Sequence, residues 1–174
     1  MKSLLSFLVI LVLSTAFAVG QSTSEEAKKL KNPKNCGVAQ YDEFKNSSFG
    51  LLSELLKTET NYEGLKTDIA GFKSGEKDIT INAVKGDISK FKKLKKSLES
   101  MDERVVALTD DGNELLKDAR NVKPVTKVKA ATDNTKKSLK AVDYSKKMID
   151  ELTGQVSSDI EYLSEQLSDL ESNQ

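Results

Sequence analysis

The sequence predicts an all-α protein: an elongated up-down-up bundle of three long helices with coiled-coil-like packing, which follows a cleaved signal peptide. Three observations support this prediction. From Val38 onward, apolar residues recur at intervals of three and four, which is the period of an amphipathic helix. Two short stretches, 73–78 and 121–124, interrupt the pattern and divide it into three parts. The alternation that is typical of strands hardly occurs, and residues 79–81 hold its only trace.

The first 20 residues contain the three parts of a secretory signal peptide in the right order. Lys2 provides a positive charge, residues 4–13 form a nearly continuous apolar run, and 16–18 or 18–20 offers a small-x-small cleavage pattern. The run is shorter than the about 20 residues that span a bilayer. We therefore predict that residues 1–20 are a cleaved signal and that the protein is secreted, either free in the extracellular space or associated with a cell surface or cell wall. An uncleaved anchor helix is the alternative.

Two regions follow the predicted signal. Residues 21–37 are polar and contain Pro33 and Gly37, which predicts a flexible N-terminal arm. Residues 38–174 form a single helical-bundle domain, because a stretch of this length suits one hydrophobic core. The single cysteine excludes a disulfide framework, so packing alone must hold this domain together.

Glycine and proline set the limits of the three predicted helices. Gly75 ends the first helix, and Pro124 suits the first turn of the third. The predicted spans are 38–72, 77–122 and 124–172. The last two helices would be about 65–70 Å long at 1.5 Å per residue, far longer than the average helix. We therefore expect breaks near Gly112 and Thr132, because a glycine and cap-preferring residues lie in the helix interior there.

Charge is balanced overall but divided along the chain. The 27 basic and 27 acidic residues give a formal net charge of zero, so no general preference for polyanions follows. Residues 85–96 and 123–147 are rich in lysine, whereas 99–118 and 148–174 are rich in carboxylates. If the second and third helices are antiparallel, each of these stretches lies beside one of opposite charge. The same pattern permits pairing between two chains, so we also expect a protein partner or self-association.

The inventory of residues argues against catalysis. The chain has no histidine and one cysteine, which excludes histidine-dependent triads and metal sites, zinc clusters and C-x-x-C redox motifs. It also lacks the phosphate-binding glycine-rich loop and the nucleophile elbow. The acidic stretch 110–114 does not fit an EF-hand loop, because Ala107 occupies the first ligand position. We expect no enzyme activity, no cofactor and no metal, and keep catalysis by paired carboxylates as a third hypothesis.

Two single residues are candidates for covalent modification. Cys36 lies where the arm meets the first helix, and Lys34 is the only close cation that could activate its thiol. An odd cysteine in an exported protein predicts an intermolecular disulfide, with a free or capped thiol and a small buried residue as alternatives. Asn46 begins the sequon Asn46-Ser47-Ser48 and is a predicted N-glycosylation site if the host is a eukaryote.

A group of lysines on the second helix is the candidate site for polyanions. Its members are Lys90, Lys92, Lys93, Lys95 and Lys96. They would contact anionic lipid or glycan, and the alternative is an ordinary solvated helix face. Nucleic acid is not expected, because only Phe91 interrupts the lysines and stacking requires several aromatic side chains. Tyr41, Phe44 and Phe49 either close one end of the core or form an exposed patch that binds a partner.

We therefore expect a secreted, non-enzymatic helical protein with an interaction or structural role, acting through protein or surface binding. The alternative is an amphipathic-helix carrier or coat, whose helices open and lay their apolar faces on lipid or another hydrophobic surface. In general outline the chain resembles the exported helical hydrophobic-surface-binding and cell-wall proteins of fungi. It is much richer in lysine than those proteins, and no motif places it among them.

Overall fold

The protein is described by a computed structural model that covers residues 23–172, and the predicted signal peptide lies outside them. Most of the described chain forms three long helices: α2 (Ala39–Ser74), α3 (Ile81–Asp118) and α4 (Val128–Ser172). Residues 23–29 form a short helix, and single 3-10 turns at Ala119–Asn121 and Val125–Lys127 connect α3 to α4. Within residues 23–172 all regular structure is helical, so the all-α prediction is confirmed.

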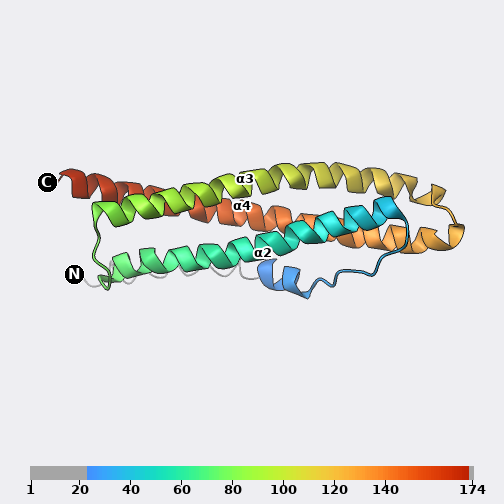
Figure 1. Cartoon of the computed structure of the whole chain (residues 1–174), viewed down its shortest axis with the longest axis horizontal. Coiled ribbons are helices and arrows are strands. Elements are labelled where there is room, and N and C mark those ends of the chain that lie inside the picture. The colour runs from blue at the N-terminus through green and yellow to red at the C-terminus, as the bar shows by residue number, and fades with distance from the viewer. Residues whose placement is uncertain (1–22, 173–174) are drawn as a thin grey trace, which may run out of the picture.

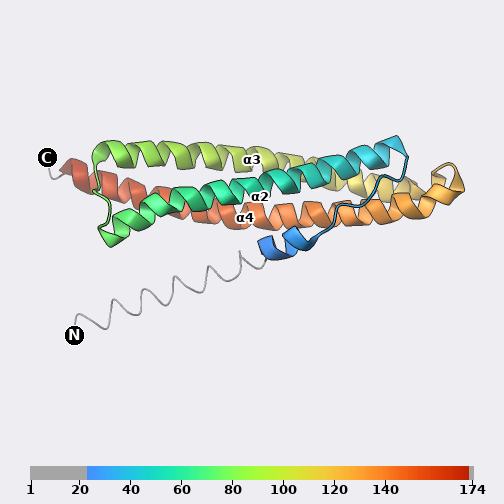
Figure 2. The same ribbon diagram turned by 60° about the horizontal axis from the view of Figure 1, so that its bottom comes forward.

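The three long helices lie side by side and give the molecule an elongated, bundle-like shape (Figure 1). α3 runs in the opposite direction to α2 and α4 (Figures 1 and 2), and every pair of the three is in contact. Lys85 at the start of α3 lies 2.8 Å from the carboxylate of Glu171 at the end of α4. Lys146 of α4 lies 3.1 Å from Asp102 of α3. These ion pairs connect residues of opposite charge on two antiparallel helices.

Local sequence explains the turn between α2 and α3. Gly75 follows α2 with a φ angle of 75°, a left-handed conformation that suits glycine, and its N–H donates to the carbonyl of Phe72. Thr80 precedes α3, and its side-chain oxygen accepts a hydrogen bond from the N–H of Ala83 at 3.2 Å. All six observed ends of the long helices lie within four residues of the predicted ends.

The core changes in character along the molecule. The first half of α4 buries five small side chains, namely Ala131, Thr135, Ser138, Ala141 and Ser145, beside larger ones such as Val142, Tyr144 and Met148. The hydroxyls of Thr135 and Ser145 each donate to the carbonyl four residues earlier, over 2.9 Å, so these polar groups are satisfied inside the helix. The second half of α4 buries only larger apolar side chains: Leu152, Val156 and Leu163. Small side chains allow neighbouring helices to approach closely, and large ones bury more apolar area.

Tyr62 connects all three long helices within this core. It is 2% exposed, and its ring meets that of Phe91 edge to face, with 6.2 Å between the centroids and 76° between the planes. Its hydroxyl donates to Asp159 of α4 at 2.9 Å. Burial raises the pKa of Tyr62 and, despite that hydrogen bond, also the pKa of Asp159. The pair is therefore a neutral donor joined to a carboxylate that takes up a proton more readily than usual.

Both expected helix breaks are wrong, because α3 continues through Gly112 and α4 continues through Thr132. Gly112 is buried where helices approach closely: a Cβ atom there would lie 2.5 Å from Leu139 Cδ2 and 2.6 Å from Phe44 Cζ. The Thr132 hydroxyl donates to the carbonyl of Val128 at 2.9 Å, so it bonds within the helix instead of capping a new one. Tertiary packing thus explains why a glycine lies in the interior of α3, where its low helix propensity alone predicts a break.

Residues 23–37, which belong to the predicted flexible arm, lie along α2 and α4 (Figure 2). Ser24 and Ala27 are each 2% exposed. The Ser24 hydroxyl donates to Glu59 of α2, and the hydroxyl of Tyr144 in α4 donates to a carboxylate of the segment at 3.0 Å. The three aromatic residues at the start of α2 are buried too, so the exposed-patch alternative is wrong. They are Tyr41, Phe44 and Phe49.

Replacing Gly112 by alanine tests the close approach of the helices. The matched control is Gly154→Ala, because Gly154 is also inside a helix but a Cβ atom there meets nothing within 4 Å. Both changes gain the same helix propensity, about 1 kcal/mol, so their difference isolates the packing at Gly112. We expect Gly154→Ala to stabilise and Gly112→Ala to be less stable than it by about 1–3 kcal/mol, measured by urea unfolding. Equal stabilities would show that the contact at Gly112 is loose.

Candidate functional site

Asp42, in the first turn of α2, binds the backbone that carries Cys36. Its Oδ1 accepts the N–H of Cys36 at 2.7 Å, and its Oδ2 accepts the N–H of Gly37 at 2.9 Å. Asp42 is only 9% exposed. A buried carboxylate requires such partners, and two N–H donors satisfy both of its oxygens.

Three further side chains hold the same stretch from other elements. Lys45 of α2, Asn134 of α4 and Lys127 before α4 donate to the backbone carbonyls of residues 33, 34 and 37, over 3.3, 2.8 and 2.7 Å. We call these three residues and Asp42 the clasp. Sequence analysis missed it. The available signal was that Asp42 and Lys45, one turn apart, share the side of α2 that carries buried residues.

The electrostatics of the clasp favour a charged Asp42. Burial opposes the negative charge, but the hydrogen bonds from Cys36 and Gly37 and the nearby Lys45 outweigh it, so the pKa of Asp42 lies below its ordinary value of 3.8. Asp42 is therefore ionised throughout the neutral range. The contribution of this carboxylate to stability is complete above pH 3.8 and is lost as the pH falls through its lower folded-state pKa.

The clasp places Cys36 in a partly buried position against a small apolar cluster between the start of α2 and the α3–α4 connection. Burial, together with Asp42, raises the pKa of the Cys36 thiol above its ordinary value of 9.0. The thiol lies 4.0 Å from the carbonyl oxygen of Val38. The protonated form therefore prevails at neutral pH, and thiolate chemistry is not favoured. An intermolecular disulfide at Cys36 stays a prediction.

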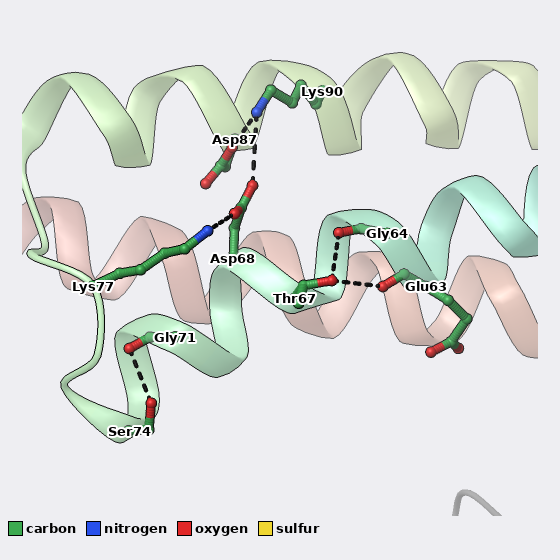
Figure 3. A network of polar contacts seen from close by, with 9 residues as sticks. All are labelled: Glu63, Gly64, Thr67, Asp68, Gly71, Ser74, Lys77, Asp87 and Lys90. Atoms are coloured by element: carbon green, nitrogen blue, oxygen red, sulfur yellow. Dashed lines mark hydrogen bonds and ion pairs between the residues drawn. The ribbon is translucent and has the colours of Figure 1, made fainter.

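The five lysines predicted as a polyanion site do not act as one group in the structure. The Lys90 ammonium lies 2.7 Å from Asp87 and 3.9 Å from Asp68 (Figure 3), and its hydrogen bond with Asp87 raises the pKa of Lys90. Lys90 therefore forms ion pairs with carboxylates of both α2 and α3. The other four differ in exposure: Lys95 is half-buried, whereas Lys92, Lys93 and Lys96 are exposed. Three exposed lysines of the predicted site thus remain as a basic surface on α3.

Asn46 is exposed on α2, within its second turn. Ser48, the third residue of its sequon, is fully buried, and its hydroxyl donates to the carbonyl of Phe44 at 2.8 Å. In the folded protein the asparagine therefore faces solvent, while the serine is held within the helix. Glycosylation of Asn46 stays a prediction.

An acidic groove of about 410 Å³ lies between the start of α2 and the end of α3. Buried or half-buried apolar side chains line its base, namely Phe44, Leu108 and Leu115. Four carboxylates border it, namely Glu43, Asp111, Glu114 and Asp118, and none of its lining residues is basic. Sequence analysis missed this groove, although 111, 114 and 118 follow the helical period. A cationic side chain with an apolar stem fits this lining.

We predict that Asp42→Asn loosens the clasp at neutral pH. One amide oxygen can replace only one of the two carboxylate acceptors, and the amide NH₂ group opposes the other backbone N–H. We expect faster hydrogen exchange at the amides of Cys36 and Gly37 and a loss of about 1–3 kcal/mol in unfolding free energy. The wild-type protein should approach the variant as the pH falls below 3.8.

The control for this change is Glu43→Gln, which removes a neighbouring exposed carboxylate that makes no contact with the clasp. Exchange at Cys36 and Gly37 should not change in that variant. If Asp42→Asn leaves exchange at both amides unchanged, Asp42 does not hold this stretch in solution.

Comparison with known proteins gives no guide to the role of these features. No protein family, curated protein or solved structure matches the chain. Among residues 23–172, no three cysteine, aspartate or glutamate side chains come together in a way that would hold a metal ion. No helix in the described part of the chain is both long enough and apolar enough to cross a membrane. The clasp, the acidic groove and the exposed lysines of α3 are therefore the features from which a function can be argued.

Proposed function

We propose that this chain is an exported, non-enzymatic protein: an elongated up-down-up three-helix bundle with coiled-coil-like packing that acts by binding a protein partner or surface. One observation supports this most directly. The exposed side of α3 carries a row of charged residues, basic at one end and acidic at the other. We call this row the α3 stripe. It consists of Lys85, Lys92, Lys96, Glu103, Asp110 and Glu114.

The α3 stripe faces away from the core. Steps of seven and four residues place its members on one side of the helix, and all six are exposed. The buried residues of the same helix, such as Val84, Phe91 and Leu98, lie on the opposite side. Within the described chain, Lys85 is the one stripe residue with an ion pair, to Glu171. Exposed charges without internal partners add little to stability and are available to contact another molecule.

The carrier hypothesis requires the helices to separate. The apolar sides of α2, α3 and α4 face one another and bury side chains such as Leu51, Leu98 and Val156 completely. Exposing each such side chain costs about 1.5–3 kcal/mol. Binding to lipid would have to offset this sum, whereas binding through the α3 stripe leaves the core intact. The interaction hypothesis is therefore the better supported of the two.

Thermal unfolding in the presence of vesicles separates the two hypotheses. We expect a cooperative melt by circular dichroism whose midpoint is the same with and without vesicles of neutral or anionic lipid. Leu98→Ala should lower the midpoint, because it removes about 2–5 kcal/mol of core packing, but should not create vesicle binding. A gain of helix or a loss of cooperativity on vesicles, enhanced in Leu98→Ala, would support the carrier instead.

Export is tested by expressing the full chain in a host with a secretory pathway. We expect the protein in the medium with an N-terminus that follows Ala18 or Gly20, as read by N-terminal sequencing. The control replaces Leu8 and Leu11 by arginine, which interrupts the apolar run without touching either cleavage pattern. That variant should remain in the cell with its N-terminus intact. Retention of the unaltered chain would contradict export.

A further inference from the structure

We propose that two copies of this chain associate in antiparallel orientation through their α3 stripes. This rests on the proposed function and deepens it, because it names the partner as a second copy. The candidate follows from the charge pattern of the stripe, which changes sign along α3, and from the acidic groove beside its acidic end.

The charges of the α3 stripe are complementary to those of the same stripe on an antiparallel second copy. Lys96 and Glu103 lie equally far from the midpoint between Glu99 and Ser100, and so do Lys85 and Glu114. A two-fold axis through that midpoint therefore places Lys85 and Lys96 opposite Glu114 and Glu103 of the second copy, and Lys92 opposite Ala107, which lies one turn from Asp110. Because such an interface is isologous, each pairing occurs twice. A parallel arrangement would instead place like charges together, which is unfavourable.

The acidic groove extends the contact at each end. Glu114 belongs both to the α3 stripe and to the border of the groove, so the basic end of the second copy would lie over it. The groove supplies Asp111 and Asp118 as further carboxylates and an apolar base for a lysine stem. Lys92 of the second copy lies opposite Ala107, one turn from Asp110. The groove and the stripe therefore favour the same occupant.

This interface is electrostatic, so salt must weaken it. Charges at exposed positions are screened over about 8–10 Å at 0.1–0.15 M salt. We expect association that is modest at physiological ionic strength, grows with protein concentration and falls on the order of tenfold between low and high salt.

Sedimentation equilibrium over a range of protein and salt concentrations tests the association. The chain carries Cys36→Ser, so that a disulfide cannot join two copies. We expect a monomer–dimer equilibrium at about 20 mM salt that shifts to monomer at about 500 mM. A monomer at every protein concentration in low salt would overturn the proposal, as would a dimer that salt does not affect.

Charge reversal tests the surface. The acidic end is reversed in Glu103→Lys/Asp110→Lys/Glu114→Lys, and the basic end in Lys85→Glu/Lys92→Glu/Lys96→Glu. Each variant alone has a stripe of one sign and should be monomeric, whereas a mixture of the two should form a heterodimer. The matched control, Lys57→Glu/Lys136→Glu/Lys137→Glu, changes as many exposed charges elsewhere and should dimerise like the parent. Failure of the mixture to associate would contradict pairing through the stripe.

Single cysteines test the antiparallel register. In the Cys36→Ser background, Ser100→Cys lies beside the proposed axis and should form a disulfide with its own symmetry mate under mild oxidation. Ser89→Cys is equally exposed but lies far from the axis, opposite Asp110, and should not. Crosslinking of Ser89→Cys alone would overturn the register. A monomeric result removes the second copy as partner but not the proposed function, which fails only if vesicles open the helices or the chain is retained.

Discussion

The rest of this structure depends on how closely α4 approaches α2 and α3. With a single cysteine there is no disulfide framework, and the first half of α4 buries five small side chains. Small side chains bury little apolar area, so this half is stabilised by tight packing against larger neighbours. At Gly112 the approach is so close that Phe44 of α2 and Leu139 of α4 occupy the space of a missing side chain. The clasp and the acidic groove lie at this same end, so their geometry follows from this approach.

The helical period was enough to place three long helices, because it extends over most of the chain with only two interruptions. It could not identify which interior positions tolerate a glycine. The cost of Gly112 is local, whereas the contacts that explain it come from residues far along the chain. The polar arm posed the same difficulty. A polar segment can be solvated or can bind polar side chains of a folded core, and its composition does not distinguish these two states. In this protein the partners of the segment include Asn134, about a hundred residues away in the sequence.

For the candidate site, sequence analysis found the residues but not their surroundings. It identified the lysines of α3 by composition, but that Lys90 is occupied by Asp87 and Asp68 depends on how α2 packs against α3. It placed Cys36 next to a helix start, but the burial that raises its pKa comes from the α3–α4 connection. The α3 stripe was within reach of the sequence. The charged residues were grouped by their order along the chain, whereas the stripe is found only when they are grouped by the side of the helix on which they lie.

The N-terminal segment doubles back along the helices, and this has a mechanical consequence. Thr23 donates to Glu151 and Ser24 donates to Glu59, and both carboxylates lie well inside their helices. The short helix formed by residues 23–29 lies far from either tip of the molecule (Figure 1). A force applied at residue 23 would therefore act on the flank of the rod. A molecule tethered at that point would lie broadside to its support, with both tips free to swing. Tension applied there would peel the segment away one hydrogen bond at a time instead of shearing the long helices past each other.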